Sequence, residues 1–288
     1  MSKVREQIWM YGAVCGAYHN PRYKLPGTNT LDCAAACRRY GLRKAVMDVC
    51  VKGPFYPFDE ESEKLAFLDE LVWTIFPSGS VTRNDGNFYD RDEIIRQIQK
   101  YPHVKGVFID DFQYRRRSHY TPQMMMDMKR MVQKAAPRPI NFWQVLYASD
   151  IFTERITPHH ILDYGAHVDT ISFWSWQPFY LKVIRENLAY LASQWPGKKV
   201  NLGIYLWDFS KGAPIEDDFM RMQLDTALEL LHGGVLEGLT ICASCIMDIG
   251  LRAEEIFAEW LDRHGDEEFA PHAAPAMPQA AIGDNERL

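Results

Sequence analysis

The sequence feature that most constrains the fold is a regular alternation of short apolar segments with longer amphipathic ones. Eight segments, rich in β-branched and aromatic residues, read as strands: Ile8–Gly16, Lys44–Cys50, Leu71–Pro77, Val104–Phe112, Ile140–Tyr147, Val168–Trp176, Val200–Phe209 and Leu239–Met247. Strands that alternate with helices form βα units around a parallel sheet. The pattern therefore predicts an α/β protein.

Helical periodicity fills the gaps between these strands. The predicted helices are Asn29–Tyr40, Asp59–Glu70, Arg91–Tyr101, Thr121–Ala135, Phe179–Trp195, Ile215–Leu231 and Leu251–Arg263, with a shorter one over Pro158–Asp163. Eight βα units in 288 residues match a single (β/α)8 TIM barrel of about 250 residues. A doubly wound open sheet is disfavoured, because no G-x-G-x-x-G turn follows the first strand.

The chain is expected to hold one barrel domain and a tail. Residues 1–265 carry the βα rhythm, whereas residues 266–288 are rich in Ala and Pro without periodicity. Such composition is typical of a flexible C-terminal tail.

Charge and composition exclude several classes of function. With 32 Lys and Arg against 38 Asp and Glu, the net charge is −6, so nucleic acid and anionic membranes are not expected partners. No signal peptide is evident and no uncharged run approaches the ~20 residues of a membrane helix. We therefore expect a soluble, cytoplasmic protein with free thiols, and a homo-oligomer is compatible with the sequence.

Candidate functional residues stand where the predicted strands end, which is where barrel enzymes carry their active sites. The carboxylates at these ends are Asp48, Asp110, Asp111, Asp208 and Asp248. Other polar and aromatic side chains accompany them: His19, Gln144, Trp174, Trp176, Tyr205 and Trp207. The opposite strand ends show no such collection.

Strand alternation predicts which of these side chains face the barrel axis. On the fourth strand, Phe108 and Asp110 should face inward. On the sixth, Trp174 and Trp176 should do so, and on the seventh Tyr205 and Trp207. Asp208 has the outward parity, although parity is a weak guide at a strand's last residue.

An inward group of Asp, Trp and Tyr suits carbohydrate chemistry. The chain is 13% aromatic, with eight Trp, which is more than a plain core requires. Sugar rings present apolar faces that lie on indoles, and hydroxyls that carboxylates and amides bind. Cleavage of a glycosidic bond generally uses two carboxyl groups, one as acid and one as nucleophile or base. A small carbohydrate substrate is therefore expected.

The segment Gly106-Val-Phe-Ile-Asp-Asp-Phe112 resembles the fourth-strand motif of several glycoside hydrolase-like TIM-barrel families, in which a strand ends in Asp-Asp-aromatic. The Trp-Ser-Trp and Trp-Asp-Phe segments of strands six and seven suit the same superfamily. The resemblance implies a glycosidase fold with a catalytic Asp on strand four, and this role transfers to Asp110 or Asp111 only.

One departure from the resemblance affects the acid. No Glu stands at any predicted strand end, whereas many such barrels use Glu as general acid. The acid is therefore expected to be Asp111, Asp208 or Asp248, with Asp110 as nucleophile or base. Arg115, in the loop after strand four, is a candidate for an anionic group on the substrate.

Two alternatives remain at this point. Asp48, Asp110, Asp111, Asp248 and His19 could bind a divalent ion in a barrel hydrolase or isomerase, although no H-x-H pair follows strand one. The barrel could also bind carbohydrate without turnover, which a single intact carboxyl group would favour. The main hypothesis is a glycoside hydrolase or transglycosidase that acts on a small glycoside or oligosaccharide through paired Asp carboxylates, and it requires neither a metal nor another cofactor.

Overall fold

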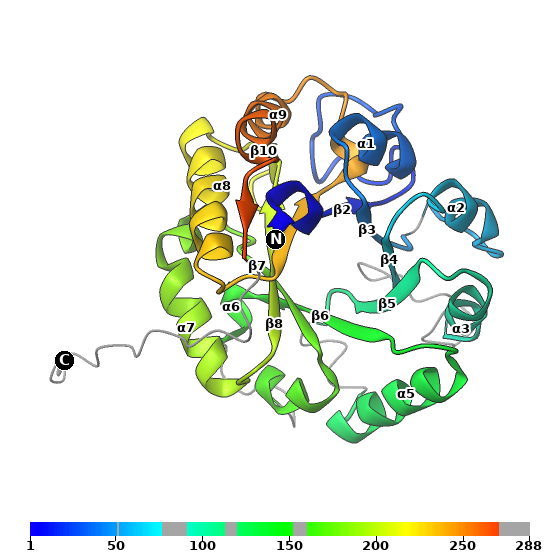
Figure 1. The fold of residues 1–288 in the computed structure, drawn as a ribbon. Coiled ribbons are helices and arrows are strands. Elements are labelled where there is room, and N and C mark those ends of the chain that lie inside the picture. Colours follow the sequence, from blue (N-terminus) through cyan, green and yellow to red (C-terminus); the bar gives the residue numbers. More distant parts are fainter. Residues whose placement is uncertain (51, 77–90, 113–119, 152–159, 271–288) are drawn as a thin grey trace, which may run out of the picture.

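The computed structural model describes residues 1–50, 52–76, 91–112, 120–151 and 160–270. A closed barrel of parallel strands forms its centre (Figure 1). In chain order the strands are β2 (Ile8–Gly12), β3 (Lys44–Met47), β4 (Glu70–Phe76), β5 (Val104–Ile109), β6 (Asn141–Tyr147), β7 (Thr170–Trp174), β8 (Lys199–Tyr205) and β11 (Gly238–Cys242). The predicted (β/α)8 barrel is confirmed.

The last strand closes the barrel against the first. Leu239 pairs with Ile8 and Cys242 with Tyr11, in parallel register. On its other side β11 pairs with β8, so each barrel strand has two neighbours and the sheet has no free edge. Closure of this kind satisfies the backbone hydrogen bonds of every strand.

Helices surround the barrel (Figure 1). They are α1 (Cys33–Tyr40), α2 (Asp59–Lys64), α3 (Arg91–Lys100), α5 (Pro122–Ala135), α6 (Ala148–Ile151), α7 (Ile184–Gln194), α8 (Asp217–His232) and α9 (Arg252–His264). Short 3-10 turns join them: η1 (Val4–Gln7), η2 (Ile161–His167), η3 (Pro178–Val183) and η4 (Ser244–Ile246).

Local chemistry sets several helix boundaries. The Asp32 side chain accepts a hydrogen bond from the Ala35 N–H and begins α1, so the predicted start at Asn29 was too early. Gly41 ends α1 in the left-handed region, with φ 64°, which glycine adopts without strain. Thr121 caps α5 at Met124, as the Thr-Pro pair predicts.

Strand ends at one face of the barrel lie earlier than predicted. The segment predicted as Ile8–Gly16 is a strand only to Gly12, and that predicted as Leu239–Met247 ends at Cys242 and continues into η4. The apolar residues beyond these ends belong to packed loops, because loops at the mouth of a barrel also bury apolar side chains.

Three predicted helices also differ from the structure. The predicted helix Asp59–Glu70 ends at Lys64, and Glu70 begins β4. The predicted helix Phe179–Trp195 divides into η3 and α7. Of the predicted helix Pro158–Asp163, residues 158–159 lie outside the described residues, and the remainder enters η2.

Two pairs of short strands lie outside the barrel. β9 (Trp207–Asp208) pairs with β10 (Ala213–Pro214) just beyond β8. β1 (Ser2–Lys3) pairs antiparallel with β12 (Glu268–Phe269) and joins the N-terminal segment to residues we had predicted as tail. The remainder of that predicted tail, from residue 271, lies outside the described residues.

The barrel interior follows the predicted alternation. The Trp143 ring packs against Trp9 and Phe108, with ring centroids 5.2 and 6.3 Å apart. Higher in the barrel, Trp174 lies over Gly203, where a Cβ would come within 2.0 Å of the indole. Only glycine fits beneath this ring, so Gly203 positions Trp174 across the barrel axis.

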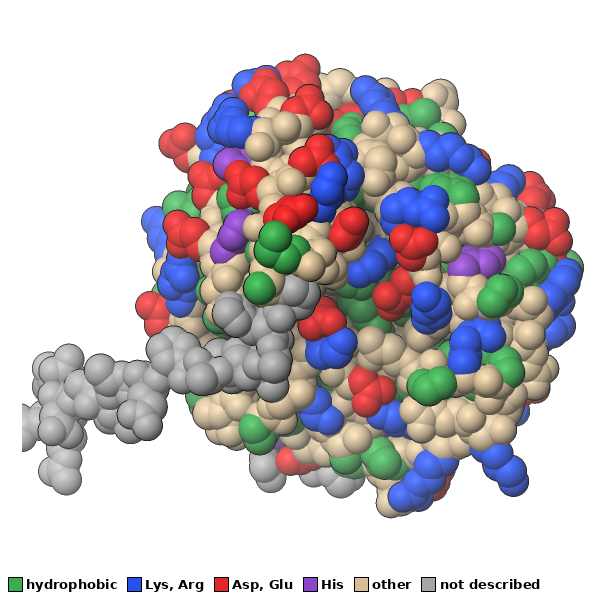
Figure 2. All heavy atoms as spheres, viewed as in Figure 1, with side chains coloured by type: hydrophobic (Ala, Val, Ile, Leu, Met, Phe, Trp, Pro, Cys, Tyr) green, Lys and Arg blue, Asp and Glu red, His purple; other side chains and the backbone are tan. Residues whose placement is uncertain are grey.

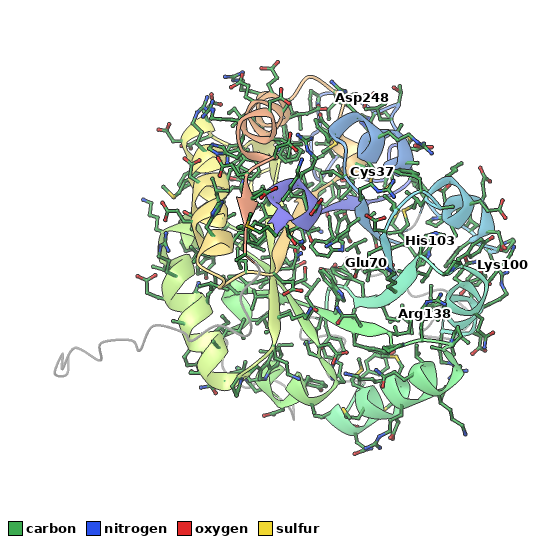
Figure 3. All side chains as sticks on the ribbon, viewed as in Figure 1. Cys37, Glu70, Lys100, His103, Arg138 and Asp248 are labelled. Carbon is green, nitrogen blue, oxygen red and sulfur yellow. The ribbon has the colours of Figure 1, made fainter. Side chains whose placement is uncertain are left out.

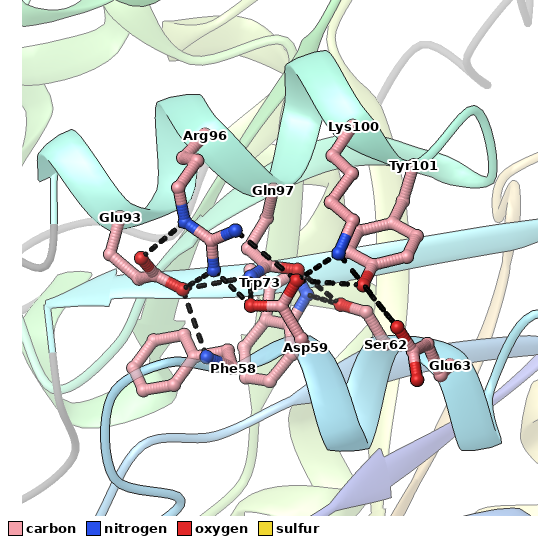
Figure 4. Close-up of polar contacts among 10 residues, drawn as sticks. All are labelled: Phe58, Asp59, Ser62, Glu63, Trp73, Glu93, Arg96, Gln97, Lys100 and Tyr101. Atoms are coloured by element: carbon pink, nitrogen blue, oxygen red, sulfur yellow. Dashed lines mark hydrogen bonds and ion pairs between the residues drawn. The ribbon is translucent and has the colours of Figure 1, made fainter.

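Polar contacts join the helices to one another. Arg96 and Lys100 of α3 bind Asp59 of α2, as Figure 4 shows. Arg138, labelled in Figure 3, donates hydrogen bonds to the carbonyls of Ile98 and Tyr101 at the end of α3. These bonds satisfy backbone acceptors that a helix end leaves free.

The surface in Figure 2 carries intermingled acidic and basic side chains. The cysteines of the described chain are free, with Cys15 exposed and Cys33, Cys37, Cys242 and Cys245 buried. Among the described helices, none combines the length and apolar character that crossing a membrane requires.

Candidate functional site

Asp110 is the centre of the site at the C-terminal end of the barrel. It follows β5 directly, and only 5% of it is exposed. Its Oδ2 accepts a hydrogen bond from the Tyr11 hydroxyl at 2.7 Å, and its Oδ1 accepts one from the Asp111 N–H at 2.8 Å. Because each oxygen accepts a hydrogen bond, the orientation of the Asp110 carboxyl group is fixed.

Asp111 lies beside it because the backbone leaves the strand conformation there. Its φ is 44°, in the left-handed region that few non-glycine residues adopt. Ordinary strand alternation would send Asp110 and Asp111 to opposite faces of the sheet. Instead the Asp111 Oδ1 accepts a hydrogen bond from the Tyr147 hydroxyl of β6 at 2.7 Å. Both carboxyl groups are thus held by tyrosines at the mouth.

The two tyrosines are neutral donors. Burial raises the pKa of Tyr11 well above its ordinary value, and the negative charges of Asp110 and Asp48 raise it further. Burial and then Asp111 raise the pKa of Tyr147 in the same way. A phenol that keeps its proton can donate to a carboxylate at any ordinary pH.

Asp48 and Cys242 complete the polar floor of this mouth. Asp48 follows β3, is fully buried, and its N–H donates to the Gly12 carbonyl at 2.7 Å. Burial raises the pKa of the Cys242 thiol, and the charges of Asp110 and Asp48 contribute to that rise. Cys242 is therefore a neutral thiol at the end of β11.

An aromatic wall stands beside the carboxylates. Its members, which contact one another ring to ring, are Tyr18, Tyr23, Tyr147, Trp174, Trp176, Tyr205 and Phe209. Trp176 stacks on Phe209 with centroids 5.9 Å apart, and Tyr205 contacts both rings. Trp176 remains half-buried, so part of its indole is open to a ligand.

The structure places Asp208 and Trp207 in other contacts. The Asp208 Oδ1 accepts hydrogen bonds from the N–H and hydroxyl of Ser210 and from the Lys211 N–H. This is the geometry of an Asx turn, which fixes a loop. The buried Trp207 donates its indole N–H to the carbonyl of Tyr23, a member of the aromatic wall, at 2.9 Å.

Asp248 and Gln144 also lie in structural contacts. Asp248 accepts hydrogen bonds from the N–H and hydroxyl of Thr30 and thereby links the loops after β11 and β2. Gln144 is buried on the outward side of β6, where its Oε1 lies 2.7 Å from His167 Nε2. Burial lowers the pKa of His167 to about 3, so this imidazole is neutral and donates to Gln144.

The remaining predicted contacts lie at the rim or outside the described residues. His19 is exposed in the loop after β2, with Nδ1 2.9 Å from the Gly27 carbonyl. Arg115 lies outside the described residues. Within the described ranges, no three His, Cys, Asp or Glu side chains are grouped in a way that could hold a metal ion.

Comparisons with solved structures match the barrel. Active domain 2 of a thermostable chitinase from Pyrococcus furiosus aligns with TM-score 0.57 and 12% identity, over 92% of this chain and 97% of that one. The barrel is shared with glycoside hydrolases. A GH5_18 protein from Bifidobacterium longum subsp. longum, in complex with Manβ1-4GlcNAc, aligns with TM-score 0.56 and 14% identity, over 95% and 80%.

A third glycoside hydrolase-like barrel is the spore cortex-lytic enzyme SleL of Bacillus megaterium. It aligns with TM-score 0.54 and 10% identity, over 94% of this chain and 76% of that chain. No family model matches the sequence. No curated protein matches it either. At identities this low the likeness establishes the fold.

Sequence reasoning missed the two tyrosines that hold the carboxylates and part of the aromatic wall. Tyr11 and Tyr147 have the inward parity of their strands, so alternation could have identified both. Tyr18, Tyr23 and Phe209 lie in loops or at a strand end, where no periodic signal predicts orientation. Their contacts depend on how the loops after β2 and β8 fold together.

Proposed function

We propose that this protein is a glycoside hydrolase that acts at the Asp110–Asp111 pair. The proposal is supported by a pair of carboxyl groups at the barrel mouth. Each accepts a hydrogen bond from a buried tyrosine hydroxyl, and the pair lies beside the aromatic wall. The carbohydrate ligands named for barrels of the same fold, Manβ1-4GlcNAc and chito-oligosaccharides, agree with a sugar substrate.

The hydrogen bonds suggest a division of roles. Asp110 accepts donors at both oxygens, which favours its charged form, so we assign it as nucleophile or general base. Asp111 is more exposed than Asp110 and is therefore the member of the pair that a leaving group can reach from solvent, so we assign it as the general acid. In this scheme the Asp111 proton passes to the leaving oxygen as the glycosidic C–O bond breaks, and the new bond to the anomeric carbon comes from the Asp110 carboxylate or from a water that Asp110 deprotonates.

The test compares single-atom changes at the pair with the same change elsewhere. Wild type is assayed on aryl glycosides and on chito-, cello- and xylo-oligosaccharides, and then Asp110→Asn and Asp111→Asn are assayed on the substrate found. We expect each to lower kcat by about 10²–10⁴-fold. The matched control is Asp127→Asn, an exposed carboxylate on α5, which should retain full activity. The proposal is wrong if both pair variants retain it as well.

A second candidate function is carbohydrate binding without turnover. It is favoured by the contacts of Asp208 and Asp248, which engage two of the predicted acids in loop hydrogen bonds, and by the lack of a Glu at the C-terminal ends of the described barrel strands. Calorimetric binding of an oligosaccharide that wild type does not cleave would support this function. The cytoplasmic location stays a prediction from the sequence.

A further inference from the structure

A second set of aromatic side chains lies at the rim of the same mouth. Phe55 and Tyr56 are 69% and 48% exposed, in the loop between β3 and α2. Loops that follow barrel strands lie at the C-terminal end of the barrel, so these rings are on the face that carries Asp110. Exposed large aromatic side chains are commonly binding determinants.

The loop that carries these rings is fixed. Cys50 and Gly53 exchange two backbone hydrogen bonds, at 2.9 and 3.0 Å. Gly53 has φ 122°, and the Phe55 ring lies over it, 3.5 Å from where a Cβ would stand. The Phe55 ring is thus seated on the loop backbone with its other side available to a ligand.

Tyr56 is supported by an aromatic column. Its ring centroid lies 5.0 Å from that of Phe58, which stacks on the buried Trp73 at 4.9 Å and 15°. The Phe58 N–H donates to Glu93 of α3. Presentation of exposed rings from a rigid base is what a preorganised binding surface requires.

The loop that carries Phe55 and Tyr56 is hydrogen-bonded to the loop after β2. Lys52 donates a hydrogen bond to the Gly16 carbonyl at 2.6 Å and so joins this loop to the one that carries Tyr18 and His19. Tyr18 belongs to the aromatic wall. The loop that carries Phe55 is therefore bound directly to a loop that contributes to the aromatic wall.

Barrel order places Phe55 and Trp176 on opposite sides of the mouth. β3 and β7 are four strands apart in either direction around the eight-stranded barrel. Phe55 follows β3, whereas Trp176 follows β7. With strands about 4.8 Å apart and tilted by about 36°, eight enclose a ring roughly 15 Å across. The Asp110–Asp111 pair, after β5, lies between these two sides.

We propose that Phe55 and Tyr56 form a carbohydrate subsite across the mouth from Trp176. The substrate is then an oligosaccharide with sugar units on both sides of the carboxylate pair. This inference rests on the proposed function and narrows the substrate predicted from the sequence, a small glycoside or oligosaccharide, to an oligosaccharide. The occupant is a sugar chain because the loop that carries the rings is hydrogen-bonded to a loop of a site built from carboxylates and indoles.

The test is the dependence of activity on chain length. Wild type, Phe55→Ala and Phe55→Trp are assayed on an aryl glycoside and on chito-, cello- and xylo-oligosaccharides from disaccharide to hexasaccharide. We expect Phe55→Ala to lower kcat/KM for the hexasaccharide by about fivefold to tenfold and to leave the aryl glycoside unchanged. Phe55→Trp should retain wild-type activity on both.

The matched control is Tyr190→Ala, an aromatic side chain 40% exposed on α7, which should change neither activity. A wild type that cleaves the aryl glycoside without preference for longer chains would overturn the subsite and leave the proposed function intact. If wild type binds oligosaccharides without cleaving them, calorimetric affinity replaces kcat/KM, with the same expected losses. If it neither cleaves nor binds any sugar of the panel, both proposals fail.

Discussion

At the scale of single residues, the orientation of Asp110 depends on the Tyr11 hydroxyl. We predict that Tyr11→Phe lowers kcat by about tenfold to a hundredfold, since a hydrogen bond to a charged group contributes about 1.5–3 kcal/mol. The donor favours the charged form of the carboxylate, so its loss should move the acidic limb of the pH–rate profile to higher pH. The profiles of wild type and variant on one substrate check this, and an unmoved acidic limb would contradict it.

For Asp208 we predict an effect on stability and little effect on activity. Its carboxylate is 4% exposed and accepts hydrogen bonds from Ser210 and Lys211, so its contribution is to the loop after β8. We predict that Asp208→Ala lowers the free energy of unfolding by about 1–3 kcal/mol and leaves kcat of the folded protein within about twofold. Urea unfolding and activity are measured on the same preparation. A large loss of kcat at unchanged stability would instead assign Asp208 as the general acid.

Residue direction was predictable from sequence only while the chain remained a strand. Alternation placed Phe108, Asp110 and Trp174 on the inner face, where the structure has them. It could not place Asp111, because a φ of 44° ends the alternation at that residue. Nor could it predict the contacts of Asp248 with Thr30, which depend on two loops distant in sequence meeting at the barrel end.

At the scale of elements, the contact between α2 and α3 depends on Asp59 (Figure 4). Hydrogen bonds from Arg96 and Lys100 hold the pKa of Asp59 below its ordinary value. A depressed pKa contributes stability above the unfolded pKa, and that stability is lost as the pH falls through the folded value. The contribution is therefore complete at neutral pH and declines below about pH 4.

We predict that Asp59→Asn lowers the free energy of unfolding at pH 7 by about 1 kcal/mol, a modest value because Arg96 and Lys100 are partly exposed to solvent. The variant should also lose less stability than wild type between pH 5 and pH 3. Urea unfolding across this range measures both effects, with Asp127→Asn as the control. Parallel pH curves for wild type and Asp59→Asn would show that the contact does not contribute.

Element type and order were predictable because period-2 and period-3.6 patterns differ clearly over a whole segment. Element ends were less so. Apolar runs such as Val168–Trp176 continue beyond β7, which ends at Trp174, because the loops at the mouth are packed with aromatic side chains. An apolar loop and an apolar strand end have the same composition, and only their tertiary contacts distinguish them.

At the scale of the molecule, a barrel with 10–14% identity to solved glycoside hydrolase folds shows how little of a barrel is specified by particular residues. Layers of inward side chains must fill the interior, and many combinations do so. Here Trp9, Phe108 and Trp143 fill the lower layer. Function belongs to the mouth, where the identity of each side chain matters.

The two ends of the described chain pair with each other through β1 and β12, outside the barrel. β12 pairs with β1, the Val4 N–H donates to the Glu267 carbonyl, and the Phe269 side chain is buried. Burial of one large apolar side chain stabilises a fold by about 1.5–3 kcal/mol, and each backbone hydrogen bond adds about 0.5–1.5 kcal/mol. These contacts belong to the folded domain, although the sequence alone predicts residues 266–270 as part of a tail.

We predict that truncation after Gly265 lowers the free energy of unfolding by about 2–5 kcal/mol, because it removes both strand pairing and the Phe269 contact. Truncation after Ala270 retains every one of these contacts, so it should leave stability within about 0.5 kcal/mol of the full chain. Urea unfolding of the three proteins separates the two outcomes. Equal stability of both truncated forms would place the end of the folded domain at Gly265, since β12 would then contribute nothing to its stability.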